Sequence, residues 1–242
     1  ANSIGIAGTV SVNGSSSVTL RPYTNGTPIN VGSTADPIGG PLSLSNPELD
    51  IVTGGTLIIG DGNSGAITVS GTITHTTPIN MQLVSGDDVT FSTGGIITGG
   101  GTLLLDPGVS PKAVKPTFTG TDATASTLTF GSDLAIVING TDHGDGTGTT
   151  YTRMTVAGAV NLTGVALMLS GMHAPILGQT FTIVDNDGAD AVVGTFTGLP
   201  QGAGISNFLG SGLYAQISYI GGTGNDVVLT VAAPATALNF DG

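Results

Sequence analysis

The sequence predicts an all-β fold, and three observations lead to this prediction. Large apolar residues and hydroxyl residues alternate with a period of two, as in Ile67-Thr68-Val69, which is the pattern of a strand with one buried and one wet face. Turn dipeptides such as Asn13-Gly14 and Gly94-Gly95 separate these runs. Charged residues, which fill the wet faces of helices, make up only 8% of the chain, while 41 of its 242 residues are glycine.

A recurring Gly-Gly-Thr-aliphatic unit favours a parallel β-solenoid over a sandwich or a closed barrel in the first part of the chain. Thr53–Ile59 is echoed by Thr93–Ile97 and again by Gly99–Leu105. Units of about 20 to 40 residues that hold two or three short strands are typical of solenoid rungs, in which each rung covers the apolar interior of the next. An aromatic content of 5% without tryptophan also favours a narrow stacked core.

Composition changes at residues 106–118, where three prolines and two lysines lie close together. Before it, Ser45–Leu49 offers an N-cap and a proline near the first helical position, which predicts one helical turn at a corner of the solenoid. The chain is therefore divided into β-solenoid repeats (residues 1–110), a linker (111–118), a β-rich C-terminal module that either stands alone or continues the solenoid (119–233) and a tail (234–242).

Charge and composition exclude several partners. The net charge of −12 and the small basic inventory, Arg21, Arg153, Lys112 and Lys115, argue against binding to nucleic acid or to anionic lipid. No apolar run reaches the roughly 18 to 20 residues that span a bilayer, so membrane insertion is not expected. Few lysines, no cysteine and abundant threonine, glycine and aspartate are typical of secreted bacterial surface proteins.

Two groups of motifs carry a family resemblance. Leu44–Leu49, Val52–Gly60 and Gly65–Val69 make residues 42–105 similar to the filamentous-haemagglutinin-type repeats of bacterial surface adhesins. Gly178–Ile183 and Gly221–Leu229 make residues 150–231 resemble a β-strand module of large secreted, autotransporter-like bacterial proteins. The resemblance implies an extracellular or cell-surface location, adhesion or the building of a biofilm matrix, and no catalysis.

Calcium is the one cofactor that the sequence leaves open. Gly221–Leu229 matches a single copy of a nonapeptide of calcium-binding β-rolls, and Asp185–Asp190 begins like an EF-hand loop but has Phe196 at its twelfth position. A glycine hairpin and a solvated acidic loop are the favoured interpretations. Zinc is not expected, because His143 has no second histidine nearby in the sequence. The candidate calcium ligands are Asp185, Asp187, Asp190 and Asp226.

The sequence shows no set of residues that predicts an enzyme. Asp87-Asp88 is the one adjacent acidic pair, and successive residues of a strand point to opposite faces, which does not suit acid–base catalysis. Lys112 and Lys115 are interpreted as solvated linker lysines, with an intramolecular Lys–Asn isopeptide bond as the alternative.

These observations predict a non-enzymatic extracellular protein that assembles with itself into a surface fibre or an adhesin stalk, by end-to-end stacking or strand addition. The alternative is a calcium-dependent glycan-binding module of a large secreted protein, with surface glycans as partners. For assembly, we expect Leu238 and Phe240 of the tail to enter a groove of a neighbouring subunit, next to an N-terminal edge strand that contains Ile4 and Ile6. The alternative is a frayed tail that makes no such contact.

Overall fold

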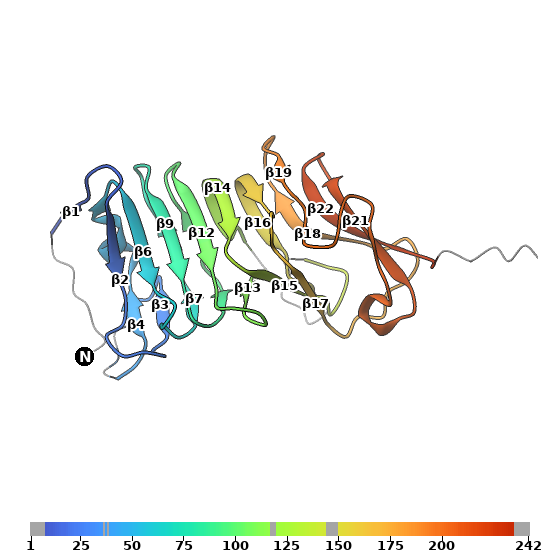
Figure 1. The fold of residues 1–242 in the computed structure, drawn as a ribbon, viewed down its shortest axis with the longest axis horizontal. Helices are drawn as coiled ribbons and strands as arrows, with labels where there is room; N and C mark the ends of the chain where they lie inside the picture. The colour runs from blue at the N-terminus through green and yellow to red at the C-terminus, as the bar shows by residue number, and fades with distance from the viewer. Residues whose placement is uncertain (1–7, 36, 38, 117–119, 144–149, 235–242) are drawn as a thin grey trace, which may run out of the picture.

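The structure, a computed structural model, describes residues 8–35, 37, 39–116, 120–143 and 150–234. Within these residues the fold is all-β, which confirms the predicted class, and most strands pair in parallel. The chain advances along the long axis of the molecule, so that residues far apart in the sequence lie at opposite ends (Figure 1). A two-stranded parallel sheet, β1 (Val10–Ser11) and β5 (Val52–Thr53), lies at the N-terminal end.

The larger sheet contains thirteen strands. Its main path runs β2-β6-β9-β12-β14-β16-β18-β22-β21-β20, with β8, β11 and β19 attached beside it. The bounds are β2 (Ser17–Leu20), β6 (Thr56–Gly60), β8 (Ile73–Thr74), β9 (Asn80–Val84), β11 (Ile96–Ile97), β12 (Thr102–Asp106), β14 (Ala123–Phe130), β16 (Met154–Asn161), β18 (Thr180–Asn186), β19 (Val192–Val193), β20 (Gly204–Ile205), β21 (Tyr214–Gly221) and β22 (Asp226–Ala232).

The second large sheet contains seven strands, all parallel. In spatial order they are β17 (Leu167–Ser170), β15 (Asp133–Val137), β13 (Ala113–Lys115), β10 (Val89–Phe91), β7 (Ile67–Val69), β3 (Ile29–Val31) and β4 (Leu42–Leu44). The two edges of this sheet are therefore β4 and β17, which lie toward opposite ends of the molecule (Figure 1).

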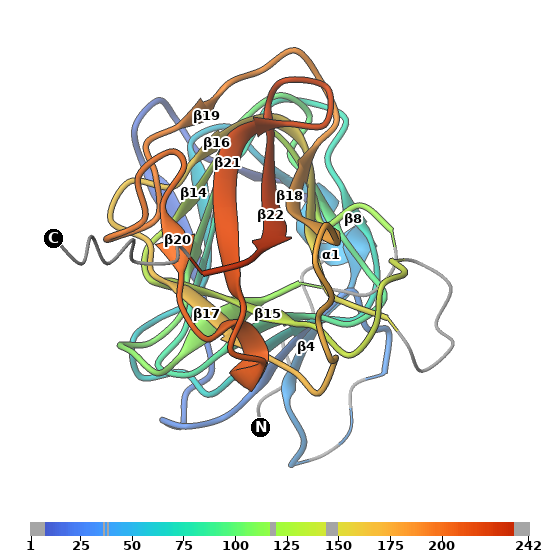
Figure 2. The ribbon, with the colours of Figure 1, turned by 90° about the vertical axis from the view of Figure 1, so that its right-hand side faces the viewer.

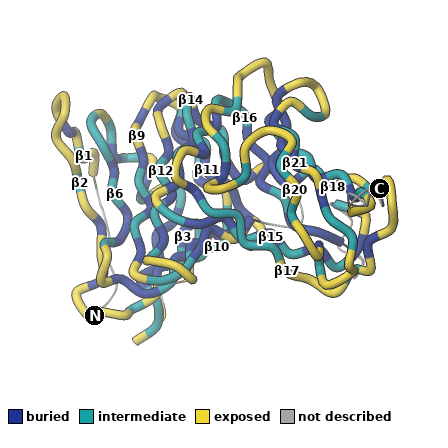
Figure 3. Tube along the Cα trace, turned by 45° about the vertical axis from the view of Figure 1, so that its right-hand side comes forward, coloured by how far each residue is buried: buried dark blue, intermediate teal, exposed yellow. Residues whose placement is uncertain are grey.

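Successive passes of the chain place similar side chains above one another. The chain visits the two sheets in the same order in β6-β7-β8, in β9-β10-β11 and in β12-β13-β14. Register pairs Leu57 with Met81, Met81 with Leu103 and Leu103 with Leu128, and all four side chains are buried. Buried positions continue along the stack, while many of the connecting loops are exposed (Figure 3). Each pass thus covers the apolar side chains of its neighbour, which is the physical reason for the alternating pattern in the sequence.

Glycine is required where the passes stack at a corner. A Cβ atom on Gly71 would lie 2.5 Å from the carbonyl oxygen of Gly32, and one on Gly94 would lie 2.2 Å from that of Gly71. No real Cβ approaches an oxygen this closely, so the three residues form a column in which only glycine fits. Part of the high glycine content therefore reflects close approach of backbones and not only turn formation.

The prediction of a linker at residues 111–118 is wrong. Within it, β13 pairs with β10 on one side and with β15 on the other, and Ala113 and Val114 are buried. The prolines and lysines lie next to a short interior strand, which composition alone does not reveal. The predicted helical turn is present as α1 (Asn46–Asp50), where the Ser45 N–H donates to Glu48 Oε2 at 2.9 Å.

The C-terminal part continues the parallel arrangement before it changes. β14, β15, β16 and β17 extend the same two sheets, and among the named strands antiparallel pairing begins where β18 meets β22. Figure 2, which looks onto this end, shows β21 and β22 lying across it. A short 3-10 helix, η1 (Phe208–Gly210), precedes β21 and buries Phe208. The antiparallel strands β21 and β22 thus cover the C-terminal end of the stack on the side of the larger sheet.

His75 introduces a pH-dependent element into the core. Its side chain is buried, its Nε2 atom has no hydrogen-bond partner among the described residues, and its Nδ1 atom lies 3.8 Å from Asp50 Oδ1. Burial lowers the pKa of His75 below 6.5, although Asp50 acts in the opposite direction. The folded protein therefore binds this proton less readily than the unfolded chain does.

We expect His75 to add no pH dependence to the free energy of unfolding above pH 6.5. Below pH 6.5 it should lower this free energy as the pH drops, because protonation then favours the unfolded chain. Urea titrations between pH 7.5 and pH 5.5 measure the slope, and His75→Leu should reduce it. An unchanged slope in the variant would show that His75 does not contribute.

Candidate binding surface

A shallow groove lies on the outer face of the seven-stranded sheet. Its volume is about 500 Å³, and side chains of four neighbouring strands line it together with two prolines. Thr90, Lys115, Ala135 and Met168 come from β10, β13, β15 and β17, and each of the four is half-buried or exposed. The lining residues are Thr90, Pro111, Ala113, Lys115, Pro116, Ala135, Val137, Thr152, Met168, Leu169 and Ser170.

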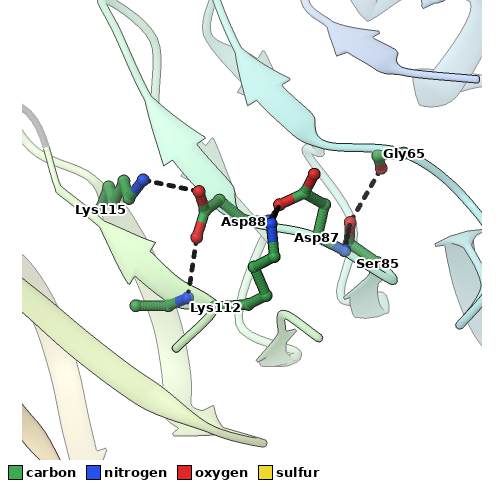
Figure 4. Close-up of polar contacts among 7 residues, drawn as sticks. Gly65, Ser85, Asp87, Asp88, Lys112 and Lys115 are labelled. Carbon is green, nitrogen blue, oxygen red and sulfur yellow. Dashed lines mark hydrogen bonds and ion pairs between the residues drawn. The ribbon is translucent and has the colours of Figure 1, made fainter. Parts of the chain in front are cut away.

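Beside this groove lies a lysine–aspartate cluster of Asp87, Asp88, Lys112 and Lys115 (Figure 4). Lys115 Nζ donates to Asp88 Oδ2 at 2.6 Å, and Lys112 Nζ donates to Asp87 Oδ1. Asp88 Oδ1 also accepts the N–H of Ala113 at 2.9 Å. The cluster therefore ties the loop before β10 to β13 in the next pass of the chain.

Hydrogen bonds extend the cluster to a third pass. Ser85 Oγ accepts the N–H of Asp87 at 3.0 Å and donates to the carbonyl oxygen of Gly65 at 2.8 Å (Figure 4). Two interpretations of the sequence are corrected here. Asp87 and Asp88 both precede β10, so the alternation of faces within a strand does not apply to them. The two lysines are half exposed, but each is paired with an aspartate and they lie beside or within β13 and not in a linker.

The charges of the cluster stabilise one another. The hydrogen bond from Lys112 lowers the pKa of Asp87, and the same bond raises the pKa of Lys112. Both shifts favour the ionised forms, whereas condensation to an isopeptide bond needs a neutral amine. Among the described residues, both lysines form ion pairs with aspartates and not contacts with asparagines, which further disfavours the isopeptide alternative.

Asp88→Ala should destabilise the protein far more than Lys115→Ala. Removing Asp88 leaves the buried N–H of Ala113 without its acceptor, which costs about 1 to 3 kcal/mol. Lys115 is half exposed, and an exposed ion pair contributes about 0 to 1 kcal/mol. Urea titrations of both variants at pH 7 measure the two values, and equal losses would contradict the assigned role of the Ala113 hydrogen bond.

The four calcium candidates are not brought together. Asp185 Oδ2 lies 2.7 Å from Arg153 Nη2, and Asp226 Oδ1 accepts the N–H of Asn186 at 2.9 Å. Asp187 is exposed, and Asp190 contributes its backbone carbonyl rather than its carboxylate to the loop's hydrogen bonds. Among the described residues, no three carboxylate, imidazole or thiol groups lie close enough to hold a metal ion.

Asparagine amides stabilise this loop, which the sequence analysis did not foresee. Asn186 Nδ2 and Asn225 Nδ2 both donate to the carbonyl oxygen of Asp190, at 2.7 and 2.9 Å. Asn225 Nδ2 also lies 2.7 Å from the carbonyl oxygen of Gly188. Both asparagines are buried, and their position next to Asp-Gly and Gly-Asn turns was the available sequence signal.

A second cluster of polar residues was also not predicted from the sequence. Arg153 and Asp185 form their ion pair next to His143, whose Nδ1 atom lies 3.0 Å from the carbonyl oxygen of Tyr151. Burial lowers the pKa of His143, and the Arg153 charge acts in the same direction. Arg153 directly precedes β16 and Asp185 lies in β18, and only the pairing of these two strands brings the two residues together.

The predicted assembly residues Leu238, Phe240, Ile4 and Ile6 lie outside the described residues. No protein-family model, curated protein or solved structure matches this chain. Among the described residues, no helix is long and apolar enough to cross a membrane.

Proposed function

We propose that this chain is a β-solenoid that serves as a non-enzymatic structural or adhesive protein outside the cell and assembles with itself into a surface fibre. The observation that carries this proposal is that the parallel seven-stranded sheet ends in an edge strand at each end of the stack, β4 and β17. Edge strands present unpaired backbone groups, which template the addition of another strand.

The composition of the edges supports assembly. β2, β4 and β17 contain no charged residue, although charged side chains are the usual protection of a sheet edge against another chain. The repeated order of the strands and the buried columns support the solenoid architecture. In such a stack, neighbouring copies extend the same hydrogen-bond ladder.

The pairing of the acidic residues supports a structural role over an enzymatic one. Asp87, Asp88 and Asp185 each form an ion pair with a lysine or an arginine, and the hydrogen bond from Lys112 lowers the pKa of Asp87. A residue that transfers protons near neutral pH instead needs a pKa close to 7.

Negative-stain microscopy of the purified full chain over a hundredfold range of concentration tests the proposal. We expect fibres whose number increases with protein concentration. Sedimentation velocity on the same samples provides an independent measure of size. Particles that remain monomeric at every concentration, with no fibres, would contradict self-assembly.

A further inference from the structure

The seven-stranded sheet stops at β17 because the following chain turns away. The N–H of Thr197 donates to the carbonyl oxygen of Val165 at 2.7 Å, which begins another parallel pass next to β17. Gly198 then adopts a φ of 73°, and the Ala203 N–H donates to the carbonyl oxygen of Pro200, which closes a turn. The chain enters β20, which pairs with β21 in the other sheet. The described residues thus leave a strand position open beside β17.

Two residues of β17 direct backbone groups into this position. The Leu134 N–H donates to the carbonyl of Ala166, and the Ile138 N–H donates to that of Ser170, so the even-numbered residues face β15. Backbone groups of a strand alternate in direction, and Leu167 and Leu169 therefore face the open edge. No described residue outside β15 and β17 forms a backbone hydrogen bond with either leucine.

A groove of about 460 Å³ occupies this place. Leu169, Ser170 and Gly171 form one wall, and residues 205–210 form the other. The second wall is anchored by the buried Phe208, while its neighbours Asn207 and Leu209 have φ values of 49° and 48°. Such left-handed conformations are costly for residues other than glycine and persist where the surroundings hold them. We call this groove the β17 slot.

We propose that the β17 slot accepts residues 237–240 of a second copy of this chain, and that two copies exchange these segments reciprocally to form a dimer. This inference rests on the proposed self-assembly and specifies one of its contacts. Leu238 and Phe240 are spaced by two, so an extended segment directs both side chains to one face. Leu169, Ile205 and Leu209 provide apolar walls for them.

The position where the described chain ends supports a second copy as the source. Ala232 pairs with Tyr214, and the carbonyl of the adjacent Leu213 accepts the Phe208 N–H at 2.8 Å, so the chain leaves close to the slot's outer wall. Ala233 precedes Pro234, which restricts it to an extended conformation. The described chain ends beyond the body of the molecule along its long axis, whereas β17 lies further in (Figure 1). Donor and acceptor lie at the same end, which favours a closed exchange between two copies.

Sedimentation velocity of the full chain, with a monomer mass of 23.7 kDa, tests the dimer. In the acceptor variant Leu169→Pro, the lost N–H faces the open edge and not β15, and proline is tolerated at such an edge. The donor variant is Leu238→Ser combined with Phe240→Ser. We expect a concentration-dependent dimer for the parent chain and at least a tenfold weaker dimer for each variant alone.

Mixing the two variants separates this proposal from a general loss of folding. The donor variant retains the slot and the acceptor variant retains the tail, so an equimolar mixture should restore a dimer with one exchanged tail. Ile205→Asp offers a second acceptor variant on the opposite wall, and Val109→Asp, at an exposed position away from the slot, should leave the dimer intact. Circular dichroism of each variant checks its fold.

The exchange is overturned if Leu169→Pro and Ile205→Asp dimerise as strongly as the parent chain. It is also overturned if the mixture of donor and acceptor variants stays monomeric. If the parent forms fibres to which these variants make no difference, the exchange is wrong while the proposed function stands. If the parent and the mixture form dimers but the parent forms no fibres, the exchange stands and the fibre proposal is wrong.

Discussion

Gly94→Ala is expected to lower the free energy of unfolding by on the order of 3 kcal/mol, toward the upper part of the range for overpacked interiors. The new Cβ would lie 2.2 Å from the carbonyl oxygen and 2.3 Å from the carbonyl carbon of Gly71. Both atoms belong to the backbone, so relief requires two passes of the chain to separate and their hydrogen bonds to lengthen. For a chain of this size, such a loss lowers Tm by roughly 6 to 12 °C.

Gly62→Ala is the matched control, because it makes the same substitution at another corner. A Cβ on Gly62 meets no atom within 4 Å, and neither Gly62 nor Gly94 has a positive φ. The control should therefore retain the parent's Tm or exceed it slightly, since alanine restricts the unfolded chain more than glycine does. Equal Tm values for the two variants, measured by calorimetry, would refute the close approach of the passes at Gly94.

Phe181→Ala should destabilise the protein by about 4 kcal/mol, as is usual when a fully buried aromatic side chain is removed. Phe181 lies where the parallel stack meets the antiparallel strands. Its ring contacts those of Tyr151, His173 and Phe208, with centroid distances of 5.5, 5.6 and 5.9 Å. The cavity would therefore open between β18, η1 and the segments that carry Tyr151 and His173. We expect a lower Tm together with less protection of β18 amides from hydrogen exchange.

Two further variants show whether this loss comes from the cavity. Phe181→Leu fills much of the same space and should cost clearly less than Phe181→Ala. Tyr23→Ala removes an aromatic side chain that is 94% exposed and should leave the unfolding free energy unchanged. A Phe181→Ala variant as stable as Tyr23→Ala would show that this aromatic cluster does not hold the two parts together.

The positions of several strands and of α1 could be predicted, because they depend on the local residue pattern. Ile67-Thr68-Val69 alternates, and β7 buries its two apolar residues as the pattern indicates. Ser45 as an N-cap and Pro47 near the first helical position indicate the single turn of α1. By contrast, Ala113–Lys115 is too short and too close to prolines to predict a strand, and only its pairing with β10 and β15 makes it one.

The candidate sites depended even more on long-range contacts. Asp87 and Lys112 are 25 positions apart, and nothing in the sequence indicates that successive passes bring them together. The calcium motif at residues 221–229 was recognisable, but a motif does not say where its partners lie, and Asp226 instead accepts a hydrogen bond from Asn186. The β17 slot could not be predicted from the sequence either, because it results from a turn that follows β19.

The sequence by itself determined that this protein is all-β, rich in turns and poor in charge, because alternation, glycine and low helix propensity act on neighbouring residues. Only the tertiary structure decided which strands pair, that the sheets run in parallel through residues 113–115, and that lysines neutralise Asp87 and Asp88. The physical reason is that stacking depends on how many residues each pass of the chain uses. A few residues more or less change every partner in the next pass while leaving the local pattern unaltered.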